Sequence, residues 1–373
     1  MSTRVLGWDI HRKFSQVSVR ELADDGELRV IERRRLEHGN RDEMRHYLAS
    51  QPAKTPVALE GAFGWPWIAD LLEECGLEPH LGHPPAIKVL NRHQPKSDRR
   101  DANRLAELYL MGIFPESYLA PVEVRQFRER VRYRIALSHL RQGVKNRIQA
   151  VLHRFGILHP FSDLFGKGGQ RFLDELQLPE ASRAVLVGYR QVLEVLDRQI
   201  AEVENWMREQ LPADEITRLL TTLPGIGLIL AHVLQAEIGQ IERFPSGRHL
   251  ASYAGLAPVS DDSADRHGVR HCSRACNHTL RWALIEAASV ISSGRARAPR
   301  LFQLYQRLSH GGRCDKNKAK VAVAHQLVKL VYVVWKKRTP YQETPPGRPG
   351  SNRSIGSRKP TAKQRPLRVS QSG

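Results

Sequence analysis

The chain has 373 residues, and its 58 lysines and arginines exceed its 39 aspartates and glutamates, giving a formal net charge of +19. This length predicts two or three domains with a sizeable core. Because the positive charge is spread over every segment, we expect a polyanionic partner, most commonly nucleic acid. A charged-then-apolar leader and a bilayer-length apolar run are not recognisable, and the four cysteines suggest no disulfide framework. These features argue against secreted and membrane proteins and predict a cytoplasmic one with no membrane partner.

The N-terminal third of the sequence alternates strand and helix patterns. The predicted elements are, in chain order, strands at 4–8, 14–20 and 27–36, a helix at 41–50, a strand at 56–59, a helix at 65–75, a strand at 79–81 and a helix within 96–110. Three antiparallel strands followed by alternating helices and strands form the order of a ribonuclease-H-like domain.

Four acidic residues lie at positions where the side chains of such a domain can form a metal site. Asp9 and Glu60 each end an apolar strand, and Asp98 and Asp101 share one face of a predicted helix. Converging carboxylates are the ligands that a pair of Mg²⁺ ions requires for phosphoryl transfer. Each acid also has a structural alternative, since Asp98 and Asp101 suit a helix N-terminus and Asp9 suits a turn. We predict a site for one or two Mg²⁺ ions.

Two long helices are predicted next, at 127–155 and 180–211, separated by a loop around 166–169. The first has an apolar stripe that includes Leu140 and Phe155, and the second repeats apolar residues at the three-four spacing of a coiled coil. This pair is either a structural arm or a subunit interface. Basic residues surround the stripe of the first helix, and we predict that they bind nucleic acid: Arg128, Arg132, Arg141, Lys145 and Arg147.

The sequence Leu-Pro-Gly-Ile-Gly at 223–227 lies between two further predicted helices. It is typical of a helix-hairpin-helix element, in which Gly225 and Gly227 let backbone N–H groups approach a DNA phosphate. An ordinary tight turn is the alternative.

A polar loop follows the Gly-Leu-Ala-Pro turn at 255–258 and ends where Asn277 begins an amphipathic helix. It contains Ser260 and Ser263, and three arginines follow them: Arg266, Arg270 and Arg274. A serine hydroxyl beside guanidinium groups suits attack on a phosphodiester, because the arginines neutralise charge that develops on the phosphate. Loops rich in serine and aspartate are also common as simple turns. Beyond residue 336, Pro, Gly, Ser, Lys and Arg predict a disordered basic tail that adds salt-dependent affinity.

Taken in order, these motifs resemble the transposases of the insertion-sequence family called "IS one-ten". The matching stretches are GWDIH at 7–11, LEGAFGW at 59–65, KSDRRDANRLAEL at 96–108, LPGIG at 223–227, RFPSGRHLASYAGLAP at 243–258 and the helix start at 277–281. The resemblance implies a RuvC-like DEDD domain at 1–120, a coiled-coil helical arm at 121–212, a mostly helical transposase domain at 213–338 and the tail at 339–373.

The resemblance also implies roles for individual residues. Asp9, Glu60, Asp98 and Asp101 take the metal-ligand positions, and Ser263 takes the position of the nucleophile. The implied enzyme is a recombinase that forms a covalent phosphoserine, is guided by a bridge RNA, and acts on donor and target DNA as a dimer or tetramer. Two positions depart from the family pattern: Ala264 follows Ser263 where glycine is usual, and Cys276 replaces the glycine before Asn277. These departures keep Ser260 as an alternative nucleophile.

Two other functions stay open from the residues alone. A metal-dependent junction nuclease would use the four acids with water as the nucleophile. A non-catalytic DNA-bridging protein would use only the positive charge.

Overall fold

The computed structural model describes residues 3–91, 98–210, 214–259, 271–272, 275–309 and 314–343; within these, the side chains of residues 98–99, 258–259 and 271–272 are not described. The chain forms two compact units, Met1–Phe127 and Arg128–Gly373. The predicted arm from residue 128 onward and the whole of the predicted transposase domain fall within the second unit, while residues 121–127 of the arm belong to the first. The boundary between arm and transposase domain stays a prediction.

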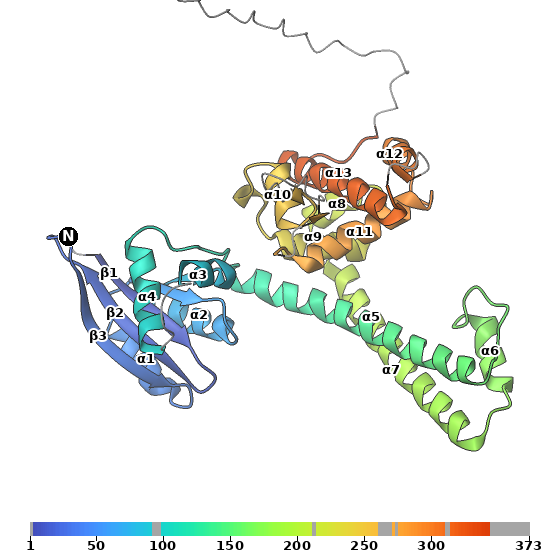
Figure 1. The fold of residues 1–373 in the computed structure, drawn as a ribbon, viewed down its shortest axis with the longest axis horizontal. Coiled ribbons are helices and arrows are strands. Elements are labelled where there is room, and N and C mark those ends of the chain that lie inside the picture. Colours follow the sequence, from blue (N-terminus) through green and yellow to red (C-terminus); the bar gives the residue numbers. More distant parts are fainter. Residues whose placement is uncertain are drawn as a thin grey trace, which may run out of the picture. The chain divides into compact units, whose positions relative to one another are not determined.

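The first unit is built on a five-stranded sheet with the order β3-β2-β1-β4-β5 (Figure 1). Its strands are β1 (Thr3–Ile10), β2 (Phe14–Leu22), β3 (Leu28–Glu37), β4 (Pro56–Glu60) and β5 (Glu78–Gly82). β1, β2 and β3 form an antiparallel meander, and β4 and β5 add in parallel beside β1. The succession of strands and helices along the chain is the one predicted from the sequence, and it fits a ribonuclease-H-like domain.

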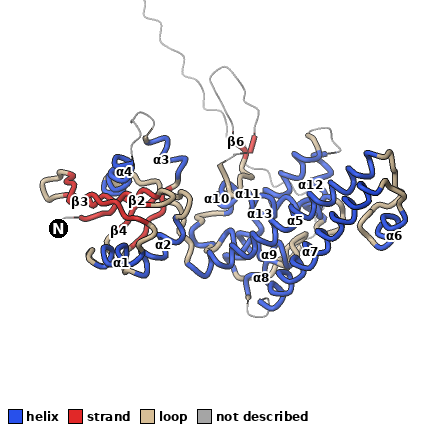
Figure 2. Tube along the Cα trace, turned by 90° about the horizontal axis from the view of Figure 1, so that it is seen from below, coloured by secondary structure: helices blue, strands red, loops and turns tan. Residues whose placement is uncertain are grey.

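Different helices cover the two faces of the sheet because side chains alternate along a strand. On one face, residues such as Trp8 and Leu59 pack in one core with residues of α1 (Arg41–Ala49) and α2 (Trp65–Glu74). On the other face lie α3 (Pro84–Leu90) and α4 (Asp98–Leu110), whose apolar residues pack with Val5 and Ala58. Figure 2 shows the strands between these two pairs of helices.

Helix α4 approaches the sheet most closely at Gly7. A Cβ atom added at Gly7 would lie 1.9 Å from the backbone oxygen of Ala102. Only glycine therefore allows the backbone of α4 to rest on β1 at this level, and the contact fixes the N-terminal half of α4 beside the end of the strand.

The second unit begins with a helical hairpin (Figure 1). Its elements are α5 (Val122–Arg154), α6 (Lys167–Glu175) and α7 (Glu180–Gln210). Arg134 of α5 pairs with Glu204 of α7, and Arg141, further along α5, pairs with Asp197, which is earlier in α7, so α5 and α7 run antiparallel. The far end of the hairpin has its own apolar core, to which α5, α6 and α7 all contribute.

Two details of the predicted arm are wrong. Leu140 is 59% exposed and Phe155 is 40% exposed, although both were placed in the apolar stripe of the first helix. The loop expected around 166–169 is instead the start of α6, which buries Leu173 in the hairpin core.

The rest of the second unit is a helical domain arranged around α13 (Lys316–Lys337). Its other elements are α8 (Glu215–Leu220), α9 (Leu228–Ile238), the 3-10 turn η2 (Ile241–Arg243), α10 (Gly247–Tyr253), the strand pair β6 (Pro258–Val259) and β7 (His271–Cys272), α11 (His278–Ser292) and α12 (Pro299–Ser309). Helix α13 packs against α8, α10, α11 and α12. None of the described helices combines the length and apolar character needed to span a bilayer. The tail predicted from 339 is described only as far as residue 343.

Candidate active site

Asp9, the second-last residue of β1, and Glu60, the last residue of β4, lie on one face of the sheet. The two strands are parallel and pair Trp8 with Leu59, so Asp9 and Glu60 follow at the same level. Trp8 and Leu59 point into the core under α1 and α2, so the alternation of side chains directs Asp9 and Glu60 to the face covered by α4.

Helix α4 brings the third acid to the same region. Asp101 precedes Ala102, the residue that rests on Gly7, and Gly7 lies two residues before Asp9 on β1. Both Asp9 and Asp101 are only partly buried. The side chain of Asp98 lies outside the described part of the chain.

The carboxylate of Asp9 has a defined neighbour. Its Oδ2 atom lies 3.0 Å from Nε2 of His11, and the His11 ring stacks on Phe14 with a centroid distance of 4.5 Å. Among the side chains that the structure describes, no three His, Cys, Asp or Glu residues form a group that could hold a metal ion. The donor type nevertheless fits Mg²⁺, which prefers carboxylate oxygens.

The loop with the candidate nucleophile can be judged only from its ends. Ser263, Ser260 and the three arginines Arg266, Arg270 and Arg274 lie outside the described residues. At the ends of this segment, β6 and β7 pair in antiparallel fashion, with Pro258 opposite Cys272. The predicted helix start at Asn277 is confirmed, since its side chain caps α11 by accepting from the N–H of Leu280 at 2.9 Å.

A polar cluster around the buried carboxylate of Glu237 links the two sides of this loop. Asn277 donates its backbone N–H to the carbonyl of Tyr253 at 2.9 Å and its side-chain amide to the Tyr253 hydroxyl at 3.1 Å. The same amide donates to Glu237 at 2.8 Å. Glu237 is fully buried in α9, and its two oxygens accept from Arg132 of α5 at 2.7 and 2.8 Å. This hydrogen-bonded pairing raises the pKa of Arg132.

Sequence reasoning missed this cluster. The available signal was a single charged residue, Glu237, within the otherwise apolar α9, because a fully buried carboxylate requires a charged or hydrogen-bonding partner. The partners themselves are far apart in the sequence and could not be identified from spacing.

The basic residues of α5 mostly have partners within the second unit. Arg128 donates to the carbonyl of Ala236 at 2.9 Å, Arg141 pairs with Asp197, and the Lys145 ammonium lies 4.5 Å from the Phe165 ring centre. Burial, followed by the charge of Arg141, lowers the pKa of Lys145. These contacts give α5 a structural use for its cations, and their role in binding nucleic acid stays a prediction. Arg147 is exposed.

The two glycines of the predicted hairpin differ in their surroundings. Gly225 has a φ of +75°, and a Cβ there would lie 2.5 Å from the backbone oxygen of Ala287 in α11. Gly225 is therefore required for packing. Gly227 caps α9, is exposed, and has open space around its Cα, so it is the better placed of the two to face a phosphate.

Comparison with known proteins places the chain in a family. Residues 6–157 match a family model for the DEDD domain of IS110 elements, described as "Transposase", and residues 217–306 match the "Transposase IS116/IS110/IS902 family". The chain belongs to the IS110 family of transposases. Membership makes it an enzyme that acts on DNA, and the first match spans all four candidate acids.

Individual transposases support the assignment. The chain is 25% identical to the transposase for insertion sequence element IS1328 of Yersinia enterocolitica, over 82% of this chain and 93% of that protein. It is 24% identical to a probable family 20 transposase of Pseudomonas aeruginosa, over 92% of this chain and 99% of that protein. Its match to the transposase for IS1111A of Coxiella burnetii is 27% identical and covers 58% of this chain but only 60% of that protein.

Proposed function

We propose that this transposase cuts and rejoins DNA strands through a covalent phosphoserine at Ser263, with Mg²⁺ held by Asp9, Glu60, Asp98 and Asp101. The observation that carries the metal part is the common level and face of Asp9 and Glu60 on neighbouring parallel strands, with Asp101 on the helix above them. Carboxylates on one face of a sheet repel one another unless a cation or another partner offsets their charge.

A Mg²⁺ ion bound by these carboxylates would neutralise charge on the phosphate and on the leaving oxygen. The chain's own residues supply the rest of the chemistry. The Ser263 oxygen attacks phosphorus and loses its proton, one phosphorus–oxygen bond of the DNA backbone breaks, and the departing sugar oxygen takes up a proton. The Ser263–phosphate ester keeps the bond energy for rejoining when a sugar hydroxyl attacks in the reverse sense.

The choice of Ser263 as the nucleophile rests on the family resemblance. Near the loop, Asn277 donates to Tyr253 and to buried Glu237, which gives the loop a stable base in the helical domain. The bridge RNA and a dimeric or tetrameric assembly are proposed from the family resemblance, together with the charge of +19.

A plasmid excision assay tests the metal site. We expect Asp9→Asn and Glu60→Gln to abolish excision while DNA binding persists. Asp42→Asn is the matched control, because Asp42 is exposed in α1 on the opposite face of the sheet. Wild-type excision by either active-site variant would refute the metal assignment.

Adduct mapping tests the nucleophile. After nuclease digestion, mass spectrometry should find a nucleotide remnant on the peptide with Ser263, and Ser263→Ala should remove both the remnant and excision. Ser260→Ala should leave both unchanged. DNA cleavage that persists in Ser263→Ala without an adduct would instead indicate a hydrolytic nuclease.

A further inference from the structure

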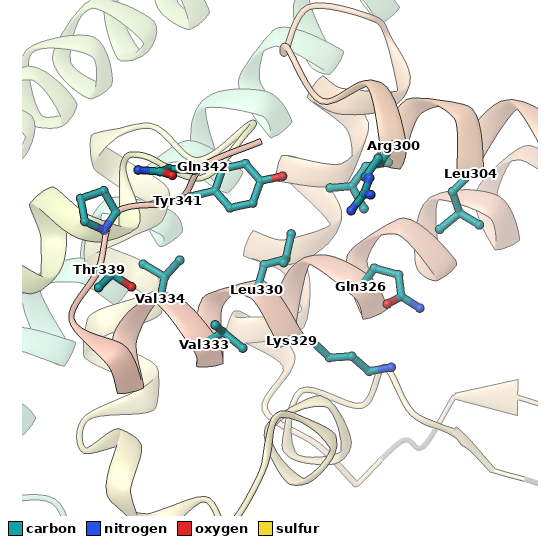
Figure 3. Close-up of a pocket in the computed structure, with 12 residues that line it drawn as sticks. Arg300, Leu304, Gln326, Lys329, Leu330, Val333, Val334, Thr339, Tyr341 and Gln342 are labelled. Carbon is teal, nitrogen blue, oxygen red and sulfur yellow. The ribbon is translucent and has the colours of Figure 1, made fainter. Parts of the chain in front are cut away.

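The helical domain contains a cavity of about 500 Å³, and no residue of the serine loop lines it. Figure 3 shows it between α12, α13 and the segment that follows α13. Its volume falls in the range of sites that hold a small organic molecule, roughly 300–1,000 Å³. No residue that lines it takes part in the proposed recombination chemistry.

The lining combines an apolar base with polar and cationic groups. The apolar and aromatic members are Leu301, Leu304, Leu330, Val333, Val334, Pro340 and Tyr341. Gln326 and Gln342 supply carboxamides, and Arg300 and Lys329 supply positive charge, while none of the described residues lining the cavity is acidic. This composition suits a ligand with a flat apolar part, hydrogen-bonding edges and negative charge.

A second cavity of about 290 Å³ in the first unit has a different character. Asp70 and Glu74 line it together with Arg41 and Arg45, so its charges are of both signs. Of these two cavities in the described part of the chain, the one in the helical domain is therefore expected to prefer an anion.

Tyr341 is fixed in place as one wall of that cavity. Its backbone N–H donates to the Thr222 hydroxyl at 2.9 Å, and its own hydroxyl donates to the Glu343 carboxylate at 2.5 Å. In Figure 3 its ring lies across the cavity from Leu330. Burial, followed by the bond to Glu343, raises the pKa of Tyr341. An aromatic ring already held in one position loses little conformational entropy when a ligand stacks on it.

We propose that this cavity binds one unstacked nucleotide of the nucleic acid on which the transposase acts. The base stacks on Tyr341 and the apolar wall, Gln326 and Gln342 meet its polar edge, and Arg300 and Lys329 face its phosphates. Carboxamides and guanidinium groups are the usual partners of base edges and phosphates. The proposal rests on the proposed function only in requiring that the chain bind nucleic acid, and it adds a nucleotide-sized site apart from the metal and serine sites.

The test uses a DNA duplex with a single bulged 2-aminopurine and a fully paired duplex of the same sequence. Binding and fluorescence are measured on the full-length Ser263→Ala protein without Mg²⁺, so the result does not depend on cleavage. The Ser263→Ala protein with an unaltered cavity should bind the bulged duplex more tightly than the paired duplex. Binding should also change the fluorescence of the bulged base. Tyr341→Ala should lose about tenfold in affinity for the bulged duplex, since base stacking on an aromatic side chain has about this effect, and should leave the paired duplex unaffected.

Further variants separate stacking from other causes. Tyr341→Phe keeps the ring and should retain the preference for the bulge, whereas Leu304→Trp fills the cavity and should abolish it. Arg307→Gln, on α12 but outside the lining, is the matched control. Circular dichroism checks that each variant folds. Leu304→Trp and Tyr341→Ala change different elements, so if one variant misfolds, the other still tests the proposal. Equal preference for the bulge in all folded variants, or no preference in the parent protein, would overturn the proposal.

Discussion

Replacing Arg132 with methionine should destabilise the second unit more than any single exposed ion pair could. The change leaves the Glu237 carboxylate fully buried with two hydrogen bonds from Arg132 removed, while the Asn277 amide at 2.8 Å and Arg128 at 3.8 Å remain. Removing one partner of a buried pair typically costs about 3–5 kcal/mol. Because the Arg132 side chain is 52% exposed, we take the lower end, about 3 kcal/mol.

The free energy of unfolding is measured by urea denaturation followed by circular dichroism, alongside thermal unfolding. For a unit of this size, about 3 kcal/mol corresponds to a fall in Tm of roughly 6–12 °C. The matched control is Arg141→Met, also on α5, whose pair with Asp197 is solvent-exposed on both sides and should contribute at most about 1 kcal/mol.

A double-mutant cycle decides whether the buried charge is the cause. In a Glu237→Met background the buried charge is gone, so Arg132→Met should then have little additional effect. Equal losses for Arg132→Met and Arg141→Met, or an unchanged effect of Arg132→Met in the Glu237→Met background, would refute the reasoning.

The glycines of the hairpin and a histidine of α13 give two further predictions. In urea denaturation, Gly225→Ala should lower the free energy of unfolding by about 2–4 kcal/mol, because the new side chain meets both a positive φ and the backbone of Ala287. The control Gly227→Ala should change the free energy of unfolding by less than about 1 kcal/mol. Similar losses for the two variants would contradict this prediction. Burial, followed by Lys329, lowers the pKa of His325 below its ordinary 6.5. The unfolded chain therefore takes up a proton first as the pH falls, and this contribution to stability is present above about pH 6.5 and lost below it. The fall in Tm from about pH 8 to about pH 5 should be smaller in His325→Asn than in the wild type, and an identical fall would exclude His325 as a source.

The sheet of the first unit was predictable because its signals are local. Apolar runs ending in Asp9 and Glu60 defined β1 and β4, and alternation along the strands then fixes which face these acids occupy. The position at which α4 crosses the sheet depends on the contact between Gly7 and Ala102. These residues lie far apart in the sequence, so spacing alone could not predict that position.

The long helices show where local signals fail. A single apolar stripe was predicted along the first helix, yet α5 contacts α9 near Arg132 and the core of α6 and α7 further along. Its buried face changes between these two environments, so that Leu140 is exposed while Leu152 is buried. The Arg132–Glu237 ion pair could not be predicted either, since the sequence identifies a basic residue but does not show whether its partner is a phosphate or a carboxylate.

The link between Tyr253 and Asn277 has an evolutionary consequence. Tyr253 ends α10 and Asn277 caps the start of α11, and two hydrogen bonds between these residues hold the two points of the helical domain together. Lengthening the loop between two such points costs little extra free energy of loop closure, about 0.6 kcal/mol for each doubling of its length. Insertions between these two residues are therefore expected to change the stability of the surrounding helices little, so the length of the segment can vary while the packing of the helices is kept.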